Sequence, residues 1–170
     1  YICKKNIYKM KKIITLLLLV SVSVANAQAF TGSGTWSAGA KGTFQEDGTG
    51  VEASIDFGLG ENFSMGIGTS YVLGISDSST YSNDFNDRID ARLRLNANLG
   101  SVFGLNPKMD VYPGLDISTK NFGGHVGFRY FFTDGFGLFT EGVFPIAKYD
   151  TESAGFNNQF TLNLGASFNL

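Results

Sequence analysis

Side chains alternate between apolar and polar along most of this chain, and this period of two constrains its fold more than any other feature. In residues 160–170, the even positions hold Phe, Leu or Ala, and the odd positions hold Thr, Asn, Gly or Ser. Residues 88–99 alternate as regularly, with Leu93 and Leu95 on one face and Arg92 and Arg94 on the other. Successive side chains of a strand point to opposite faces, whereas a helix repeats near 3.6 residues. The sequence therefore predicts an all-β fold.

The same alternation predicts eight strands, each close to the roughly 9–11 tilted residues that cross a bilayer. Turn-forming residues separate most of them, and the two longest linkers are residues 74–87 and 148–155. Pro113 lies inside the fifth strand and lacks a backbone N–H, so we expect a bulge or a bend there. The expected strands are residues 35–44, 51–59, 63–73, 88–99, 109–117, 122–132, 136–146 and 160–170.

The polar face of these strands distinguishes a membrane barrel from a soluble one. A soluble barrel would turn its charges outward, whereas a membrane barrel turns them into the lumen. Here the charged face is also rich in small residues, including Gly58, Gly66, Gly68, Gly123 and Gly127. Small residues suit the crowded interior of a narrow barrel, where long neighbouring side chains must fit. We therefore interpret the polar face as the lumen.

Aromatic residues on the apolar face gather near the strand ends when the two termini are placed on one side. Membrane barrels carry such aromatic girdles at both interfaces, although Phe128 breaks the pattern by lying near the middle. The alternation and the girdles together predict an eight-stranded antiparallel up-and-down transmembrane β-barrel in the outer membrane, with both termini in the periplasm and outer-membrane lipids around it. The expected girdles are Trp36, Phe57, Phe63, Tyr130, Phe132, Phe136 and Phe168 on the periplasmic side, and Phe44, Tyr71, Phe122, Phe144 and Phe160 on the outer side.

The start of the chain has the pattern of a secretory signal. Met10 is followed by two lysines, an apolar run over residues 13–24 and the small residues Ala25 and Ala27. That run is shorter than the roughly 20 residues that cross a bilayer as a helix. We predict an upstream leader in residues 1–9 that is not native, a signal peptide in residues 10–27 and the barrel in residues 28–170.

Charge and cysteine content exclude several functions. The part after the predicted cleavage site keeps eight basic residues against 15 acidic ones, a formal net charge of −7. Nucleic acid is therefore not an expected partner, because phosphate contacts need a basic face. The only cysteine, Cys3, lies in the leader, so the barrel has no thiol nucleophile and no Cys metal site. We expect no catalytic residues, no metal and no cofactor.

Two stretches resemble a known group of proteins. Residues 109–141, above all GFRYFFTD at 127–134, and the ending LNLGASFNL at 162–170 are similar to small outer-membrane barrels of the OmpA-type, opacity-protein-like class. The resemblance implies architecture and no shared reaction. It also implies that the barrel-assembly machinery recognises the C-terminal strand, which in the family usually closes on an aromatic residue. This chain instead ends in Leu170, with Phe168 two residues before it.

Two sets of residues are candidates for function, and neither is catalytic. Tyr81 and Phe85, with Asp77 and Asp84, form a candidate surface loop for an unidentified extracellular ligand. The only histidine, His125, should project into the lumen and is interpreted as structural. We therefore expect a non-enzymatic barrel with an envelope-structural or surface-interaction role and a plugged lumen; a narrow porin-like channel or small-ligand conduit is the alternative. The expected lumen network comprises Glu52, Asp56, Asp90, Arg92, Arg94, Asp110, Asp116, His125, Arg129 and Glu141.

Overall fold

Eight strands follow one another along the chain in a computed structural model that describes residues 29–75, 84–149 and 155–170. One turn of helix, α2 (Phe85–Arg88), precedes the fourth strand, and one turn of 3-10 helix, η1 (Gly155–Asn158), precedes the last. Among the described residues, no helix is long and apolar enough to cross a membrane. The strands are β1 (Trp36–Gln45), β2 (Gly48–Gly58), β3 (Phe63–Ile75), β4 (Ile89–Ala97), β5 (Met109–Ser118), β6 (Asn121–Thr133), β7 (Phe136–Lys148) and β8 (Thr161–Asn169).

The eight strands close into a barrel. Each strand pairs antiparallel with its sequence neighbours, and β1 also pairs with β8, so that Lys41 of β1 lies between Glu52 of β2 and Gly165 of β8. Closure leaves no open edge, which a sheet in hydrocarbon needs because unpaired backbone groups there cost several kcal/mol each. The predicted eight-stranded, up-and-down transmembrane barrel fold is confirmed.

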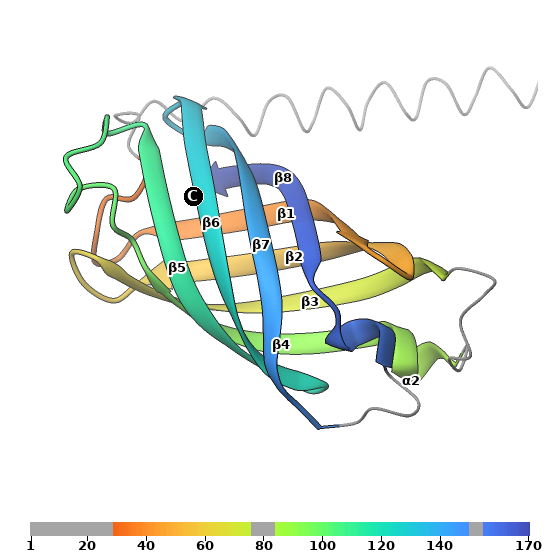
Figure 1. Ribbon diagram of the computed structural model, residues 1–170. Coiled ribbons are helices and arrows are strands. Elements are labelled where there is room, and N and C mark those ends of the chain that lie inside the picture. Colours follow the sequence, from red (N-terminus) through yellow and green to blue (C-terminus); the bar gives the residue numbers. More distant parts are fainter. Residues whose placement is uncertain (1–28, 76–83, 150–154) are drawn as a thin grey trace, which may run out of the picture.

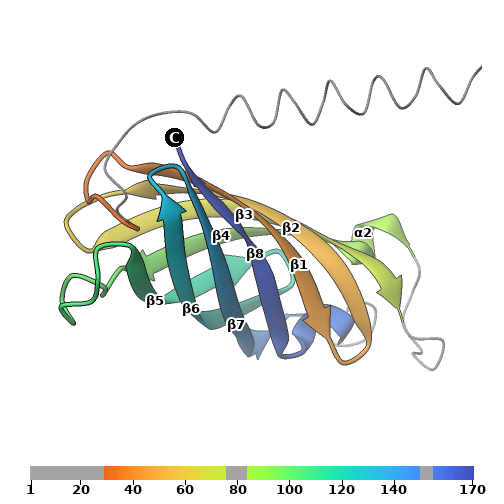
Figure 2. The ribbon, with the colours of Figure 1, turned by 90° about the horizontal axis from the view of Figure 1, so that it is seen from above.

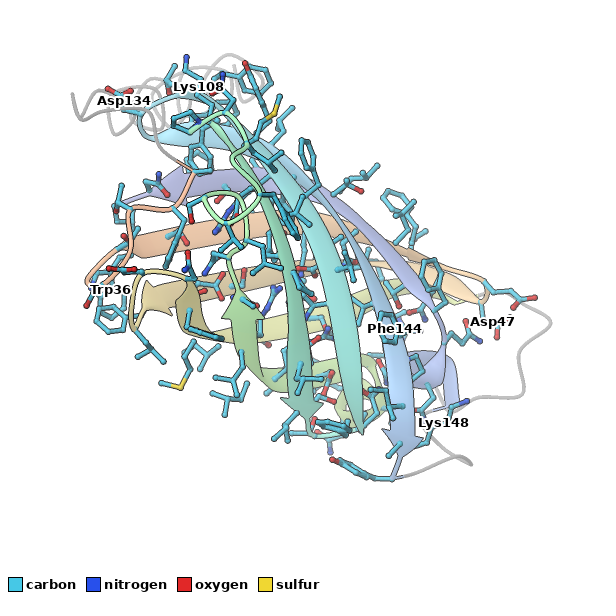
Figure 3. The ribbon with its side chains drawn as sticks, turned by 60° about the vertical axis from the view of Figure 1, so that its left-hand side comes forward. Trp36, Asp47, Lys108, Asp134, Phe144 and Lys148 are labelled. Carbon is cyan, nitrogen blue, oxygen red and sulfur yellow. The ribbon has the colours of Figure 1, made fainter. Side chains whose placement is uncertain are left out.

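The two ends of the barrel differ (Figures 1 and 2). The terminal end carries residues 29–35, the end of β8 and the connections at 59–62, 98–108 and 134–135. The loop end carries the turn at 46–47, helix α2, the turn at 119–120 and η1. Figure 3 shows Asp47 and Lys148 at the loop end, and Lys108 and Asp134 at the terminal end.

The barrel is apolar outside and charged inside. The outward-facing Ile67 and Phe63 are 64% and 63% exposed, whereas the charged Glu141 is 1% exposed. A protein in water buries its large aliphatic residues and leaves its carboxylates solvated. The opposite arrangement here is that of a membrane barrel, and it confirms that the polar face of the alternation is the lumen.

Aromatic side chains lie in contact near the terminal end. Trp36 packs on Phe57 with ring centroids 4.9 Å apart. A second series joins three strands, with centroid distances of 5.0 Å from Tyr130 to Phe132, 6.3 Å from Phe132 to Phe136, and 5.5 Å from Phe136 to Phe168. A band of aromatic rings at one level is typical of the membrane–water interface of a membrane barrel.

Irregular pairing occurs at places other than the one predicted. The register shifts between Thr49 and Gly50 in the β2–β3 ladder and at two points in the β6–β7 ladder. Of the bulge or bend predicted at Pro113, the bulge is absent from the β5–β6 ladder, which passes through this residue without a register shift. The β4–β5 ladder instead ends at Asn96 opposite Gly114, next to the proline, and is the shortest of the eight. A proline has no N–H to donate, so it ends pairing on one side only.

The predicted strand boundaries differ from the structure by up to three residues, and two of the differences change the connections. The fourth strand ends at Ala97, two residues before its predicted end, and the chain then turns. The linker expected at 74–87 is shorter than predicted, because β3 continues to Ile75 and α2 begins at Phe85. Local alternation locates a strand well, but its last residues depend on the neighbouring strand.

Candidate functional site

The lumen is the candidate site, since inward positions of all eight strands meet there. The predicted residues from Glu52 to Glu141 all lie on this face, and most are buried. Lys41 joins them from β1. Lys41 lies opposite Glu52 in the β1–β2 register, and Arg94 lies opposite Asp116 in the β4–β5 register. Opposed residues on one face have adjacent side chains, so the register itself places cations beside carboxylates.

Glu141 is the centre of the lumen network. Its Oε1 accepts hydrogen bonds from Lys41 Nζ at 2.6 Å and from Asn163 Nδ2 at 3.1 Å, and its Oε2 accepts one from Arg94. Lys41 also forms an ion pair with Glu52, with Nζ 2.9 Å from Oε1. One carboxylate on β7 is therefore bonded to β1, β4 and β8. Buried charges persist in a protein only where such partners compensate them.

His125 belongs to the same network and is 1% exposed. Its Nδ1 lies 2.7 Å from Asp116 Oδ2, and its Nε2 lies 2.8 Å from Asn96 Oδ1. The amide nitrogen of Asn96 donates to Asp56 at 3.1 Å and to Ser64 at 3.0 Å, so its oxygen is left to accept from the histidine. Both ring nitrogens of His125 are thus engaged within the barrel wall.

Towards the loop end, the network continues through Arg92. Its guanidinium lies 3.2 Å from Asp90 and 3.6 Å from Glu52, and it is more exposed than the central charges. Asp90 also accepts a hydrogen bond of 2.7 Å from the Thr119 hydroxyl in the β5–β6 turn. The ion pair of Arg92 with Asp90, which is the nearest to the loop end, is therefore bonded to the turn at 119–120.

Towards the terminal end, Arg129 completes the network. It donates to Asp110 Oδ2 from two nitrogens, at 2.7 and 3.1 Å, and to Asn98 Oδ1 at 2.6 Å. Its guanidinium carbon lies 4.9 Å from the ring centroid of Tyr112, within the range of a cation–π contact. Asp110 also accepts a 2.8 Å bond from the backbone N–H of Gly100. The lumen charges are thus bonded to the 98–108 connection.

Glycines on the inward face leave room for these side chains. A Cβ on Gly114 would lie 2.4 Å from the ring of His125, and a Cβ on Gly127 would lie 2.1 Å from the ring of Tyr112. Each glycine lies opposite the large residue in the β5–β6 register. The close approach explains physically why small residues alternate with charges on this face.

The lumen is packed closely enough to leave little space. The cavity among Arg94, Asn96, Tyr112 and Arg129 has a volume of about 20 Å³, close to the roughly 10–15 Å³ that a single water requires. Among the described residues, no group of three or more His, Cys, Asp or Glu side chains is arranged to hold a metal ion.

The candidate surface loop is described only in part. Asp77 and Tyr81 lie outside the described residues, while Asp84 and Phe85 are exposed at the start of α2. The Phe85 ring packs on Tyr71, an aromatic residue of the predicted outer girdle, with centroids 5.6 Å apart. Phe85 therefore extends the aromatic band, which its position in a polar linker did not indicate.

Besides Lys41, four uncharged polar residues of the lumen network were absent from the predicted set: Ser64, Asn96, Asn98 and Asn163. All four are buried and bonded to one another or to charges. Their position in the polar phase of the alternation was the available signal. They carry no charge, and the predicted set comprised ionisable side chains, although a buried amide supplies both donors and acceptors.

Comparisons with known proteins agree with this architecture. The family described as a family of unknown function, DUF6646, matches residues 20–170. No curated protein matches the sequence. A chain from work on the de novo design of transmembrane β-barrels is similar with a TM-score of 0.57 and 11% identity, covering 82% of this chain and 98% of that one. The N-terminal β-barrel domain of Pseudomonas aeruginosa OprF is similar with a TM-score of 0.53 and 11% identity, covering 82% and 100%. At such identity the likeness concerns the fold alone.

Proposed function

Because this chain belongs to DUF6646, a family of unknown function, we propose its role from the barrel itself: a non-enzymatic outer-membrane protein with a closed lumen and an envelope-structural or surface-interaction role. The observation that carries this proposal is the ion-paired interior. Glu141, Arg94 and His125 are each at most 3% exposed and are bonded across the barrel. An eight-stranded barrel has an interior just wide enough for side chains, and here charged ones fill it.

Conductance tests the closed lumen. Purified protein in planar bilayers should give no stable current steps, because the central cavity of about 20 Å³ cannot hold a hydrated ion path. A matched preparation of Glu141→Gln, which loosens the centre of the network, serves as a comparison. Reproducible steps from the wild-type protein would contradict the proposal and favour the alternative of a narrow porin-like channel or small-ligand conduit.

The surroundings of Arg94 favour the alternative of a narrow channel or conduit. Arg94 bonds to Glu141 but also lies 3.7 Å from Asp116 and 3.9 Å from Glu52. These longer separations exceed a direct hydrogen bond, so the guanidinium has two further carboxylates to turn to. An exchange of partners would loosen the centre of the plug. Current steps that depend on Arg94, and disappear in Arg94→Leu, would support a conduit.

We place both termini in the periplasm. Outer-membrane barrels have short turns on that side and longer loops outside. The two longest linkers, 76–88 and 149–160, lie at the loop end, and the 98–108 connection at the terminal end is the exception to this pattern. Two single-cysteine variants test this orientation: Glu46→Cys introduces a thiol in a turn at the loop end, and Asp134→Cys introduces one in a turn at the terminal end. A membrane-impermeant maleimide on intact cells should label the first and not the second. Labelling of only the second would reverse the orientation.

A surface role is supported by bonds that hold the base of the loop end together. Lys120 Nζ donates to the backbone oxygen of Asn86 at 2.9 Å, and Asn157 Nδ2 donates to that of Asp87 at 2.8 Å. Asn121 Nδ2 in turn donates to the backbone oxygen of Asn157 at 2.8 Å. These bonds join three connections at the loop end, one of which contains segment 76–83. Replacing that segment with a Gly-Ser linker should lower adhesion of intact cells, and unchanged adhesion would count against the surface role.

A further inference from the structure

Residues 29–35, here termed the strap, cross the mouth of the barrel at its terminal end (Figures 1 and 2). At one side, the backbone of Gly58 at the end of β2 receives a bond from Gly34 at 2.9 Å and donates one to Thr35 at 2.8 Å. At the other side, the N–H of Ala29 donates to the backbone oxygen of Pro107, just before β5, at 2.8 Å. The strap thus joins two parts of the rim that are separated by β3 and β4.

Directly beneath the strap lies the outermost layer of the lumen network. The Phe30 ring centroid is 5.8 Å from the guanidinium carbon of Arg129. Arg129 bonds to Asn98, and Asn98 Nδ2 donates to the Ser64 hydroxyl at 3.1 Å, one layer deeper. A cavity of about 100 Å³ lies between Phe30, Asn98, Asp110 and residues 105–107. That volume exceeds the roughly 10–15 Å³ that one water needs, so the mouth contains a vestibule, which is lined by both polar and apolar side chains.

The two sides of the strap are held unequally. The Gly58 side has two backbone hydrogen bonds, whereas the Pro107 side has one, supplemented by the contact of Phe30 with Arg129 and by the buried methyl group of Ala29. Between them, Gly32 and Gly34 adopt φ values of +93° and +85°. Glycine occupies this left-handed region without the steric cost that other residues meet. A change of backbone angles at these two glycines would allow the weaker side to move without disturbing β1.

We propose that the strap is a lid over this vestibule: it opens at the Ala29–Pro107 side and admits small hydrogen-bonding solutes as far as Asn98 and Ser64. The vestibule is blind, because the layer of Arg94 and Glu141 closes the barrel beyond it. This inference goes beyond the closed-lumen function and does not depend on it, since the lid controls entry from one end only.

Thiol reactivity at Ser64, which is bonded to Asn98 in the wall of the vestibule, tests the lid. Ser64→Cys, in a chain in which Cys3 is replaced by serine, places a near-isosteric thiol at a 3% exposed position beneath the strap. In Gly58→Ala, the new Cβ would lie 2.0 Å from the Gly32 backbone oxygen, so the strap must move. Gly60→Ala is the matched control, because a Cβ there meets nothing within 4 Å. The probe is a small methanethiosulfonate reagent applied to the folded protein in detergent.

We expect Gly58→Ala to raise the labelling rate of Ser64→Cys about tenfold, a change equivalent to about 1.4 kcal/mol in the opening equilibrium. Gly60→Ala should leave the rate unchanged. Phe30→Ala removes the contact with Arg129 on the weaker side without adding an atom, so it should also raise the labelling rate of Ser64→Cys. If Gly58→Ala does not fold, the labelling rate in Phe30→Ala decides whether the strap is a lid. Equal rates in all these proteins, or equal acceleration by Gly58→Ala and Gly60→Ala, would overturn the lid.

Discussion

Replacing Glu141 with glutamine tests the energetic role of the lumen network. Glu141→Gln keeps the shape of the side chain but removes the charge that faces Lys41 and Arg94. Removing one partner of a buried ion pair usually costs about 3–5 kcal/mol, because the remaining charge is left buried. Lys41 keeps Glu52 at 2.9 Å, while Arg94 keeps only carboxylates 3.7 and 3.9 Å away. Since part of the compensation survives, we expect about 3 kcal/mol, at the lower end of that range.

Unfolding by urea in detergent micelles or lipid vesicles measures this loss. Trp36 is the only tryptophan and lies in the aromatic girdle at the terminal end, so its emission reports the transfer of the barrel from the apolar phase to water. A loss of about 3 kcal/mol lowers the folding equilibrium constant about a hundredfold. The control Glu46→Gln, in an exposed turn, should change stability by less than about 0.5 kcal/mol.

A double variant separates the ion pair from its surroundings. Lys41→Met combined with Glu141→Gln removes both charges of the 2.6 Å contact. Its cost should be smaller than the sum of the single costs, because neither charge of the pair remains buried without its partner. A Glu141→Gln protein as stable as the wild type, or strictly additive costs, would refute the reasoning that these charges compensate one another.

Further predictions follow from the two faces of the barrel and from its ladders. Gly127→Ala should cost about 1–3 kcal/mol in the same unfolding assay, because its Cβ would overlap the Tyr112 ring. Gly60→Ala is the control and should leave the stability unchanged; an equally unchanged stability of Gly127→Ala would contradict the prediction. Ile67→Lys, at a position 64% exposed on the apolar band, should cost about 2–4 kcal/mol in vesicles, whereas Thr133→Lys at the rim should cost about 0–1 kcal/mol. Amide hydrogen exchange should be faster in the β4–β5 ladder than in the longer β2–β3 ladder, and uniform protection would contradict a weak seam beside Pro113.

Much of the fold was readable from the sequence because a strand in a membrane barrel meets two different solvents on its two faces. Leu93 and Arg94 are neighbours in the chain, yet one is 41% and the other 3% exposed. Period-two alternation carries that information residue by residue. It also placed His125 in the lumen, together with small residues such as Gly127.

The partners within the lumen could not be read in the same way. Arg94 bonds to Glu141 across the barrel, and this pairing depends on strand tilt and on the stagger between strands, which alternation does not specify. The same limit explains Pro113: its missing N–H was evident, but whether a bulge or an ended ladder would follow depended on where β4 stops. The strap was not predicted, because residues 29–35 have no alternation and their positions follow from contacts with Gly58 and Pro107.

The inside-out arrangement can be measured directly with nitroxide labels on single cysteines in lipid vesicles. Leu164→Cys lies mid-strand on the outer face of β8, and Asp134→Cys lies in the turn at the terminal end. Collisions with oxygen, which concentrates in acyl chains, and with a water-soluble nickel chelate distinguish the two surroundings. We predict frequent oxygen and rare nickel collisions at residue 164, and the reverse at residue 134. Nickel collisions as frequent at residue 164 as at residue 134 would mean that the apolar face meets water, which contradicts a membrane barrel.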